Sequence, residues 1–340
     1  MTSSVDGLNA ALDVAIQILR THQRFVLTTH VNPDGDGLGS EFALASWLHT
    51  MGKDVRIVNC SPTPVVYDFL DPEKSVLCFD PQRDSSLLSS ADVIVMLDTN
   101  DPSRLRSMQD AYLSSPARKI CIDHHLDASS FADDFVIDSE ATSTGELVYR
   151  LLQQSRDAAI TAEIASALYC AIMTDTGSFR YPRVDAETHQ IVADLIEHGA
   201  DPVGIYGEVF ERWTNGRIHL LGEALASMDV MYDGQLAHLS ITREMLQRTG
   251  TLEEDTDNFT VYPMSLKGVR IGILFLELKN GLKVSFRSKG TIPVNELARE
   301  FGGNGHLNAA GARISHGTLE HYRALIVSAA KSYLSLEHST

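Results

Sequence analysis

Apolar and polar positions alternate differently in the two halves of the chain. In the first half, short apolar runs rich in β-branched residues alternate with longer stretches whose apolar residues recur at helical spacing. The predicted strands are 24–30, 54–60, 92–99 and 119–125, and the predicted helices are 39–52, 142–155, 161–173 and 186–199. Nearly continuous apolar strands separated by helices are typical of a parallel sheet covered on both faces. We therefore predict an N-terminal α/β domain with a doubly wound, mainly parallel sheet.

The second half has a different pattern. A polar helical stretch at 202–229 shows little strand character and is predicted to be a connector. Beyond it, the runs 234–241, 269–278 and 281–288 resemble antiparallel strands, and the tripeptide at 279–281, Lys-Asn-Gly, is a good hairpin turn. The predicted domains are therefore 1–201, a helical linker at 202–229, and a smaller C-terminal α/β domain at 230–340, with the catalytic cleft between the two domains.

Length and charge narrow the class of protein. A chain of 340 residues suits two domains, and its net charge of −17 argues against a protein that coats long nucleic acid. We see no signal peptide and no apolar run as long as a membrane span, and four scattered cysteines favour free thiols in a reducing compartment. We therefore expect a cytoplasmic protein. Residues 260–313 carry eight basic and three acidic side chains, which fits either a solvated basic face or a pocket for a small anion.

Acidic and histidine residues gather where the apolar runs end. They are His30, Asp34, Asp36, Asp98, Asp123, His124, His125 and Asp175. Singly, an Asp in such a place is usually a turn former or a helix N-cap. Together, several carboxylates on one sheet edge repel each other strongly unless cations neutralise them, and ligands gather at this edge of parallel sheets. The glycines at 35, 37 and 39 are predicted to permit a tight turn there.

This donor set predicts a pair of divalent ions. The carboxylates of Asp34, Asp36, Asp98 and Asp175 would balance two ions, and His30 and His124 would add neutral nitrogen ligands. Oxygen-rich coordination with some imidazole suits manganese, with magnesium as the alternative, better than structural zinc. Two neighbouring divalent ions are typical of enzymes that transfer or hydrolyse phosphoryl groups, so the sequence indicates phosphoester hydrolysis.

Five motifs occur in the order HVNPDGDGLGS, LDTND, IDHH, TDTGSF and GGNGHLNAAG. In this order the chain resembles the DHH phosphoesterase superfamily, in the branch with the DHH-associated C-terminal domain. Within it, the chain is similar to the bacterial oligoribonuclease (nanoRNase) and adenosine 3′,5′-bisphosphate phosphatase group.

The resemblance implies roles for the residues of the first domain. One ion would be held by His30, Asp34 and Asp98, and the other by Asp36, Asp98, His124 and Asp175, so that Asp98 bridges. Asp123 would fix a histidine tautomer. His125 would face the substrate as a phosphate contact or proton donor, or else serve as a further ligand. Arg104 and Arg180 would either reach substrate phosphates or form surface ion pairs.

The resemblance also implies a substrate-binding role for the C-terminal domain. GGNGHLNAAG at 302–311 resembles a glycine-rich loop that clasps a terminal phosphate or nucleotide, with Asn304 where the family usually has glycine. Because Asn tolerates positive φ, we expect the loop conformation to survive. The implied contacts are Arg287, Ser288, Lys289, Gly302, Gly303, Gly305 and His306.

The function implied is an enzyme, a phosphodiesterase and phosphomonoesterase that acts by two-metal hydroxide attack. Its substrates would be very short RNA and dinucleotides, cleaved to 5′-mononucleotides, and adenosine 3′,5′-bisphosphate, which would lose its 3′-phosphate. The alternatives are an inorganic pyrophosphatase and a catalytically silent nucleotide or cyclic-dinucleotide sensor. We expect neither a membrane nor a long nucleic acid as partner. The sequence leaves the oligomeric state open, with a homodimer as one option.

Overall fold

The chain divides into two compact units, Met1–Arg212 and Trp213–Thr340. The computed structural model describes residues 5–125 and 130–335. Within this part of the chain, no helix is both long and apolar enough to span a membrane.

The first unit is built on a six-stranded sheet with the order β3-β2-β1-β4-β5-β6, in which every neighbouring pair is parallel. The strands are β1 (Arg24–Thr28), β2 (Asp54–Asn59), β3 (Leu77–Cys78), β4 (Val93–Leu97), β5 (Arg118–Asp123) and β6 (Asp134–Ile137). The strand order reverses between β1 and β4, and in doubly wound sheets ligands bind beyond the carboxyl ends of the strands at such a point.

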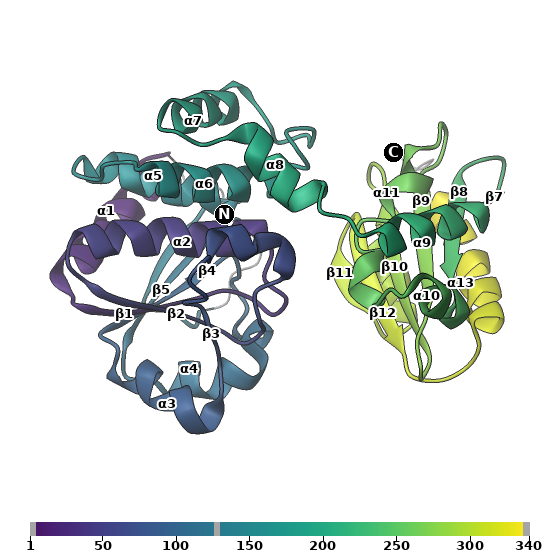
Figure 1. Cartoon of the computed structure of the whole chain (residues 1–340), viewed down its shortest axis with the longest axis horizontal. Coiled ribbons are helices and arrows are strands. Elements are labelled where there is room, and N and C mark those ends of the chain that lie inside the picture. Colours follow the sequence, from purple (N-terminus) through teal and green to yellow (C-terminus); the bar gives the residue numbers. More distant parts are fainter. Residues whose placement is uncertain (1–4, 126–129, 336–340) are drawn as a thin grey trace. The chain divides into compact units, whose positions relative to one another are not determined.

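Helices cover both faces of this sheet, as Figure 1 shows. One face carries α1 (Val5–Thr21), α2 (Gly35–Thr50), α5 (Thr144–Ser155) and α6 (Ala162–Asp175), and the other carries α3 (Pro81–Ser90) and α4 (Gln109–Ser114). The remaining elements are α7 (Ala186–Glu197), α8 (Pro202–Phe210) and two 3₁₀ helices, η1 (Val65–Leu70) and η2 (Pro102–Met108). The predicted doubly wound, mainly parallel domain is confirmed.

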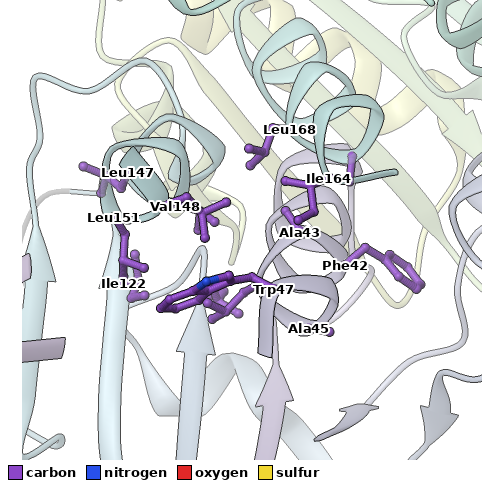
Figure 2. Packing of buried hydrophobic residues seen from close by; sticks show 14 of the residues in the cluster. Phe42, Ala43, Ala45, Trp47, Ile122, Leu147, Val148, Leu151, Ile164 and Leu168 are labelled. Atoms are coloured by element: carbon purple, nitrogen blue, oxygen red, sulfur yellow. The ribbon is translucent and has the colours of Figure 1, made fainter. Parts of the chain in front are cut away.

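The larger core lies between the sheet and the α2, α5 and α6 layer. Trp47 of α2 is 1% exposed and lies among side chains of α5 and α6 and Ile122 of β5 (Figure 2). A second cluster, under α3 and α4, contains Leu88 and Tyr112. Both faces of the central strands are therefore buried, which explains their unbroken apolar runs.

The glycines that follow β1 have a different function from the predicted one. Gly35, Gly37 and Gly39 do not form a tight turn but lie in the first turns of α2, none of them at positive φ. A β-carbon on Gly39 would lie 2.3 Å from the carbonyl oxygen of Ala167 in α6, and one on Gly35 would lie 2.5 Å from Thr174. The glycines therefore let α2 and α6 approach closely, and this approach brings the start of α2 to the end of α6.

The second unit contains a six-stranded sheet with the order β11-β12-β10-β9-β8-β7. Its strands are β7 (Asp229–Met231), β8 (Leu236–Ile241), β9 (Ile271–Glu277), β10 (Leu282–Ser288), β11 (Asn304–His306) and β12 (Ala309–Ile314). Its helices are α9 (Asn215–Ala226), α10 (Arg243–Thr249), η3 (Glu253–Thr256), α11 (Val261–Ser265), α12 (Val294–Glu300) and α13 (Leu319–Leu334).

The two faces of this sheet pack against different helices. Along β9, Ile273 and Phe275 join the cluster with α12 and α13, whereas Leu274 and Leu276 join the cluster with α9. This alternation follows from the two-residue period of a strand. The smaller C-terminal α/β domain predicted from the sequence is therefore present.

One predicted pairing in this unit is wrong. The hairpin at 279–281 joins β9 and β10 as expected, but β8 and β9 are parallel and not antiparallel. The segment between them contains α10, η3 and α11, so it is long enough to cross over and return in the same direction.

The predicted linker at 202–229 consists of two helices that belong to different units. Ile205 and Val209 of α8 are buried in the core of the first unit, whereas Leu220 and Ala224 of α9 are buried in the second. The division between the units falls in the short segment between these helices.

The close approach of α2 and α6 leads us to predict how substitutions of glycine change the free energy of unfolding. Gly39→Ala should destabilise the first unit by about 1–3 kcal/mol, because its new methyl group meets a backbone oxygen that cannot move alone. Gly207→Ala in α8 is the control, since the nearest atom to its new β-carbon is 3.8 Å away at the end of Glu211, and helix propensity should stabilise it by up to about 1 kcal/mol. Urea unfolding of both variants tests this, and equal midpoints would contradict it.

Candidate active site

The residues predicted from the strand ends meet at the carboxyl edge of the first sheet. His30 follows β1, Asp98 follows β4, Asp123 ends β5, and His124 and His125 come next. Asp34 caps α2, Asp36 lies in its first turn, and Asp175 is the last residue of α6. The site therefore lies at the point where the strand order reverses.

The ligand atoms fall into two groups that share Asp98. In the first group, His30 Nε2 lies 3.2 Å from Asp98 Oδ2 and 3.7 Å from Asp34 Oδ2. In the second group, His124 Nε2 lies 3.3 Å from Asp175 Oδ2, 3.7 Å from Asp36 Oδ2 and 3.7 Å from Asp98 Oδ1. The two oxygens of Asp98 thus face different groups. Candidate ligand atoms lie within 4.8 Å of one another in three sets, which are His30, Asp34 and Asp98; Asp36, His124 and Asp175; and Asp98, His124 and His125. The third set keeps open the alternative that His125 is a further ligand.

Asp98 is held in an unusual backbone conformation. Its φ is +59°, a left-handed value that only a small share of non-glycine residues adopt and that concentrates at functional sites. Its N–H donates to the carbonyl of Ile122 at 3.1 Å, and its Oδ1 accepts from Thr144 Oγ1 at 3.2 Å. These contacts fix the carboxylate between the two groups.

The N-terminus of α5 positions Asp36, which sequence reasoning did not foresee. The N–H groups of Thr144 and Gly145 donate to the two carboxylate oxygens of Asp36 at 2.7 and 2.8 Å. The signal in the sequence is the run Ser-Thr-Gly-Glu, in which Ser143 caps the helix. It predicts the helix start but not which distant carboxylate that start will bind.

The electrostatics of the site suit cations. Burial, together with the neighbouring carboxylates, raises the pKa of Asp36 and Asp98 well above the usual value and raises that of Asp175 to about 7. Burial and the nearby His125 lower the pKa of His124 to about 4, so its imidazole is neutral. Neutral imidazole nitrogens beside mutually repelling carboxylate oxygens fit divalent ions, because a cation removes the repulsion. Residues of this chain can therefore hold metal.

Asp123 contacts His125 and not His124. Its fully buried carboxylate accepts from His125 Nδ1 at 2.7 Å, while His124 Nδ1 lies 3.3 Å from the carbonyl oxygen of Ala141. A proton on Nδ1 leaves Nε2 as the His125 nitrogen that is free of a bound proton in the neutral ring. Asp123 therefore sets the orientation and tautomer of His125.

The two arginines near these motifs differ in their surroundings. Arg104 lies in η2, where its carbonyl accepts from the N–H of Val31 at 2.9 Å, and its positive charge acts on Asp34. Arg180 donates through Nε to the carbonyl of Gly177 at 2.7 Å. Arg104 thus lies beside the first ligand group, and Arg180 braces the turn after α6.

In the second unit, the predicted substrate contacts lie in two segments. Arg287, near the end of β10, lines a polar cavity together with Thr256, Asp257, Asn258, Lys283 and Ser285. Lys289 is exposed. The side chain of Ser288, in contrast, is buried, donates to the carbonyl of Ile292 at 2.7 Å and accepts from Asn308 at 2.8 Å. Its hydroxyl stabilises the following turn.

The glycine-rich segment is a short strand and not an open loop. Residues 304–306 form β11 and pair with β12, and Asn304 does not have positive φ. A β-carbon on Gly303 would lie 2.2 Å from the carbonyl oxygen of Gly311, and one on Gly305 would lie 2.5 Å from that of Ala309. These glycines let β11 approach β12, and Gly302 precedes them with a φ of +76°. The side chain of His306 lies outside the described part of the structure.

A doubly wound sheet with carboxylates and imidazoles gathered at its switch point defines a class of metal-binding α/β enzymes. Residues 24–172 match the DHH family, N-terminal domain, and residues 248–335 match the DHHA1 domain. The chain belongs to the DHH family. The assignment to the DHH phosphoesterases with a DHH-associated C-terminal domain, and hence the prediction of an enzyme, is confirmed.

The similarity to known proteins covers nearly the whole length of this chain. The bifunctional oligoribonuclease and PAP phosphatase NrnA of Thermus thermophilus is 28% identical over 91% of this chain and 90% of its own length. The protein of the same name from Bacillus subtilis is 27% identical over 88% of this chain and 92% of its own length. The crystal structure of an exopolyphosphatase-related protein from Bacteroides fragilis has 33% identity and a TM-score of 0.92, over 96% of this chain and 97% of that one.

Because Asp98 lies between both groups of ligand atoms, we predict that replacing it lowers the metal content of the protein. Asp98→Asn should lower the number of Mn²⁺ ions bound per chain, because it removes the charge common to both ligand groups while Asn tolerates the left-handed backbone. Asp123→Asn is the matched control and should keep its metal, because its contact is to His125. Equilibrium dialysis with metal analysis tests this. Equal Mn²⁺ content in the two variants would contradict the prediction that Asp98 is a ligand common to both groups.

Proposed function

We propose that the chain is a metal-dependent phosphoesterase that cleaves very short RNA and dinucleotides to 5′-mononucleotides and removes the 3′-phosphate of adenosine 3′,5′-bisphosphate. The observation that carries the proposal is Asp98, whose two oxygens face two separate sets of ligand atoms. The curated relatives named oligoribonuclease and PAP phosphatase support the choice of substrates.

In this proposal two divalent ions, manganese or magnesium, are held by the predicted ligands. His30 and Asp34 would hold one, Asp36, His124 and Asp175 the other, and Asp98 would contact both. When bound, such ions activate water and neutralise charge on the phosphate oxygens. The protein contributes the fixed positions of the carboxylates, which the α5 N–H groups and Thr144 maintain.

His125 acts on protons at the phosphate. Its Nδ1–H donates to the buried Asp123 carboxylate, so Nε2 is the nitrogen that exchanges a proton with the substrate. The same hydrogen bond fixes the orientation of the ring. Hydrolysis adds water across the phosphorus–oxygen bond, so the attacking water loses one proton and the leaving oxygen takes one. His125 would give the leaving oxygen the Nε2 proton of its doubly protonated ring, and Nε2 would then take up a proton released by water.

The second unit supplies contacts to a phosphate away from the bond that breaks. The cavity beside Arg287 is also lined by Asn258, Ser285, Asp257 and Lys283. Because Lys283 pairs with Glu253 at 3.2 Å and lies 3.9 Å from Asp257, Arg287 is the cation assigned to the phosphate. A guanidinium binds phosphate through a planar pair of N–H groups, which an ammonium cannot match. The net charge of −17 disfavours capture of a long polyanion, so local cations of this kind favour short substrates.

The proposed activity is tested with a panel of substrates. Purified protein, freed of metal by chelation and then given Mn²⁺ or Mg²⁺, is assayed on a dinucleotide, a five-nucleotide RNA, a twenty-nucleotide RNA, adenosine 3′,5′-bisphosphate and pyrophosphate. We expect no turnover without metal and the highest kcat/KM on the shortest RNAs and the bisphosphate. Full activity in metal-free protein, or a preference for pyrophosphate or the twenty-nucleotide RNA, contradicts the proposal.

Arg287→Ala separates distal binding from chemistry. Loss of a charge-assisted contact worth about 2–4 kcal/mol should lower kcat/KM on the dinucleotide roughly 30- to 1000-fold. Activity on bis-p-nitrophenyl phosphate should change little, because this ester has no distal phosphate. Arg299→Ala, which removes an exposed arginine from α12, is the matched control and should leave both activities intact. Equal losses on both substrates with Arg287→Ala rule out a distal contact.

A further inference from the structure

The chain makes a sharp left-handed turn directly after Asp175. Gly177, Ser178 and Phe179 have φ values of +58°, +59° and +63°, and non-glycine residues rarely adopt such values. The turn is held by hydrogen bonds from the N–H of Ser178 to the carbonyl of Met173 at 2.8 Å and from the N–H of Phe179 to Thr176 Oγ1 at 3.0 Å. Its position beside the ligand groups is therefore well defined.

This turn presents an exposed aromatic ring. Tyr181 is 55% exposed, although its backbone is fixed by an N–H bond to the carbonyl of Thr176 at 3.1 Å. Its ring lies against Gly177, where a β-carbon would be 2.6 Å from two of the ring atoms. Because Gly177 has no side chain, the Tyr181 ring can pack against its backbone. More than half of the tyrosine nevertheless remains exposed to solvent.

A cation lies on the same segment. Arg183 is exposed and, among the described residues, its guanidinium makes no hydrogen bond or ion pair, whereas Arg180 is bonded to the carbonyl of Gly177. Arg183 lies in the turn directly after Tyr181, which is closed by a hydrogen bond from the N–H of Val184 to the carbonyl of Tyr181 at 3.0 Å. Sequence reasoning considered Arg180 and did not consider Arg183, and only the hydrogen bonds of the structure separate the two.

We propose that the segment Thr176–Arg183 is a nucleotide platform, in which Tyr181 stacks on the base of the nucleotide at the ligand groups and Arg183 contacts its phosphate. A base offers a flat apolar face, and a tyrosine ring that already packs against the Gly177 backbone loses little conformational freedom when it stacks on such a face. The Arg183 guanidinium, which makes no hydrogen bond or ion pair with the residues that the structure describes, can bind phosphate oxygens through two N–H groups. This inference rests on the proposed function and specifies which part of the substrate the first unit recognises.

The platform is tested by comparing a dinucleotide with the same compound lacking the base on the reacting nucleotide. Tyr181→Ala should lower kcat/KM on the dinucleotide about 5- to 150-fold and leave the abasic compound unchanged. Tyr181→Phe should retain wild-type values on both. Tyr206→Ala, which removes an exposed tyrosine from α8 of the same unit, is the matched control. Equal losses on the two compounds with Tyr181→Ala, or no loss on either, overturn the platform.

Substitution of Arg183 should give a different result from substitution of Tyr181 in the same assay. Arg183→Ala should lower kcat/KM on the dinucleotide and the abasic compound alike, by about 10- to 100-fold, because both carry the phosphate, and Arg183→Lys should restore part of the loss. Arg56→Ala, at another exposed arginine of the first unit, is its control. Wild-type values for Arg183→Ala on both compounds overturn the assignment of Arg183.

Equilibrium binding separates this inference from the proposed function. With Mn²⁺ present, calorimetry should give wild-type protein a higher affinity for adenosine 5′-monophosphate than for ribose 5-phosphate, and Tyr181→Ala should abolish the difference. If wild-type protein hydrolyses no dinucleotide, the proposed function fails, but this difference still supports the platform. Equal affinities of wild-type protein for the two ligands overturn the platform even in an active enzyme.

Discussion

The mutual repulsion of buried carboxylates is the constraint on which the site depends. Burial disfavours the ionised forms of Asp36, Asp98 and Asp175, and the negative charge of Asp34 raises the pKa of all three further. These carboxylates are held by donors aimed at them, namely two N–H groups of α5 and the hydroxyl of Thr144, and lie beside the neutral imidazole of His124. These groups position the carboxylates but do not cancel their charge, so the site is one that could hold metal ions.

The packing of the first unit maintains this arrangement. Because all strands are parallel, His30, Asp98 and Asp123 emerge from the same edge of the sheet. The close approach of α2 and α6 brings Asp36 at the start of one helix near Asp175 at the end of the other. A glycine at position 39 and the core around Trp47 thus act on the site although neither touches it (Figure 2).

Charge is distributed unevenly in this acidic protein. The net charge is −17, yet Arg104 and Arg183 act on the ligand groups of the first unit, and Lys283 and Arg287 line a cavity of the second. Binding of a small anion depends on such local cations, whereas binding of a long polyanion depends on many contacts over a wide surface. The distribution is therefore consistent with a small phosphorylated substrate.

The sequence by itself determined the four central strands of the first unit, the helices α2, α5, α6 and α7, and the residue types at the strand ends, but not α1, β3, α3, α4 or β6. Unbroken apolar runs between helical patterns indicate a parallel sheet, and short motifs keep His30, Asp98 and His124 next to strands whatever the details of packing. Only the tertiary structure decided that the two oxygens of Asp98 face different groups of ligand atoms. The tertiary structure likewise decided that the N-terminus of α5 binds Asp36, which lies 108 positions earlier in the chain, and that β8 runs parallel to β9. It also decided that Gly39 serves helix contact and that Tyr181 is exposed. The physical reason is that periodicity shows which face of an element is buried, whereas its partner is set by contacts between segments far apart in the chain.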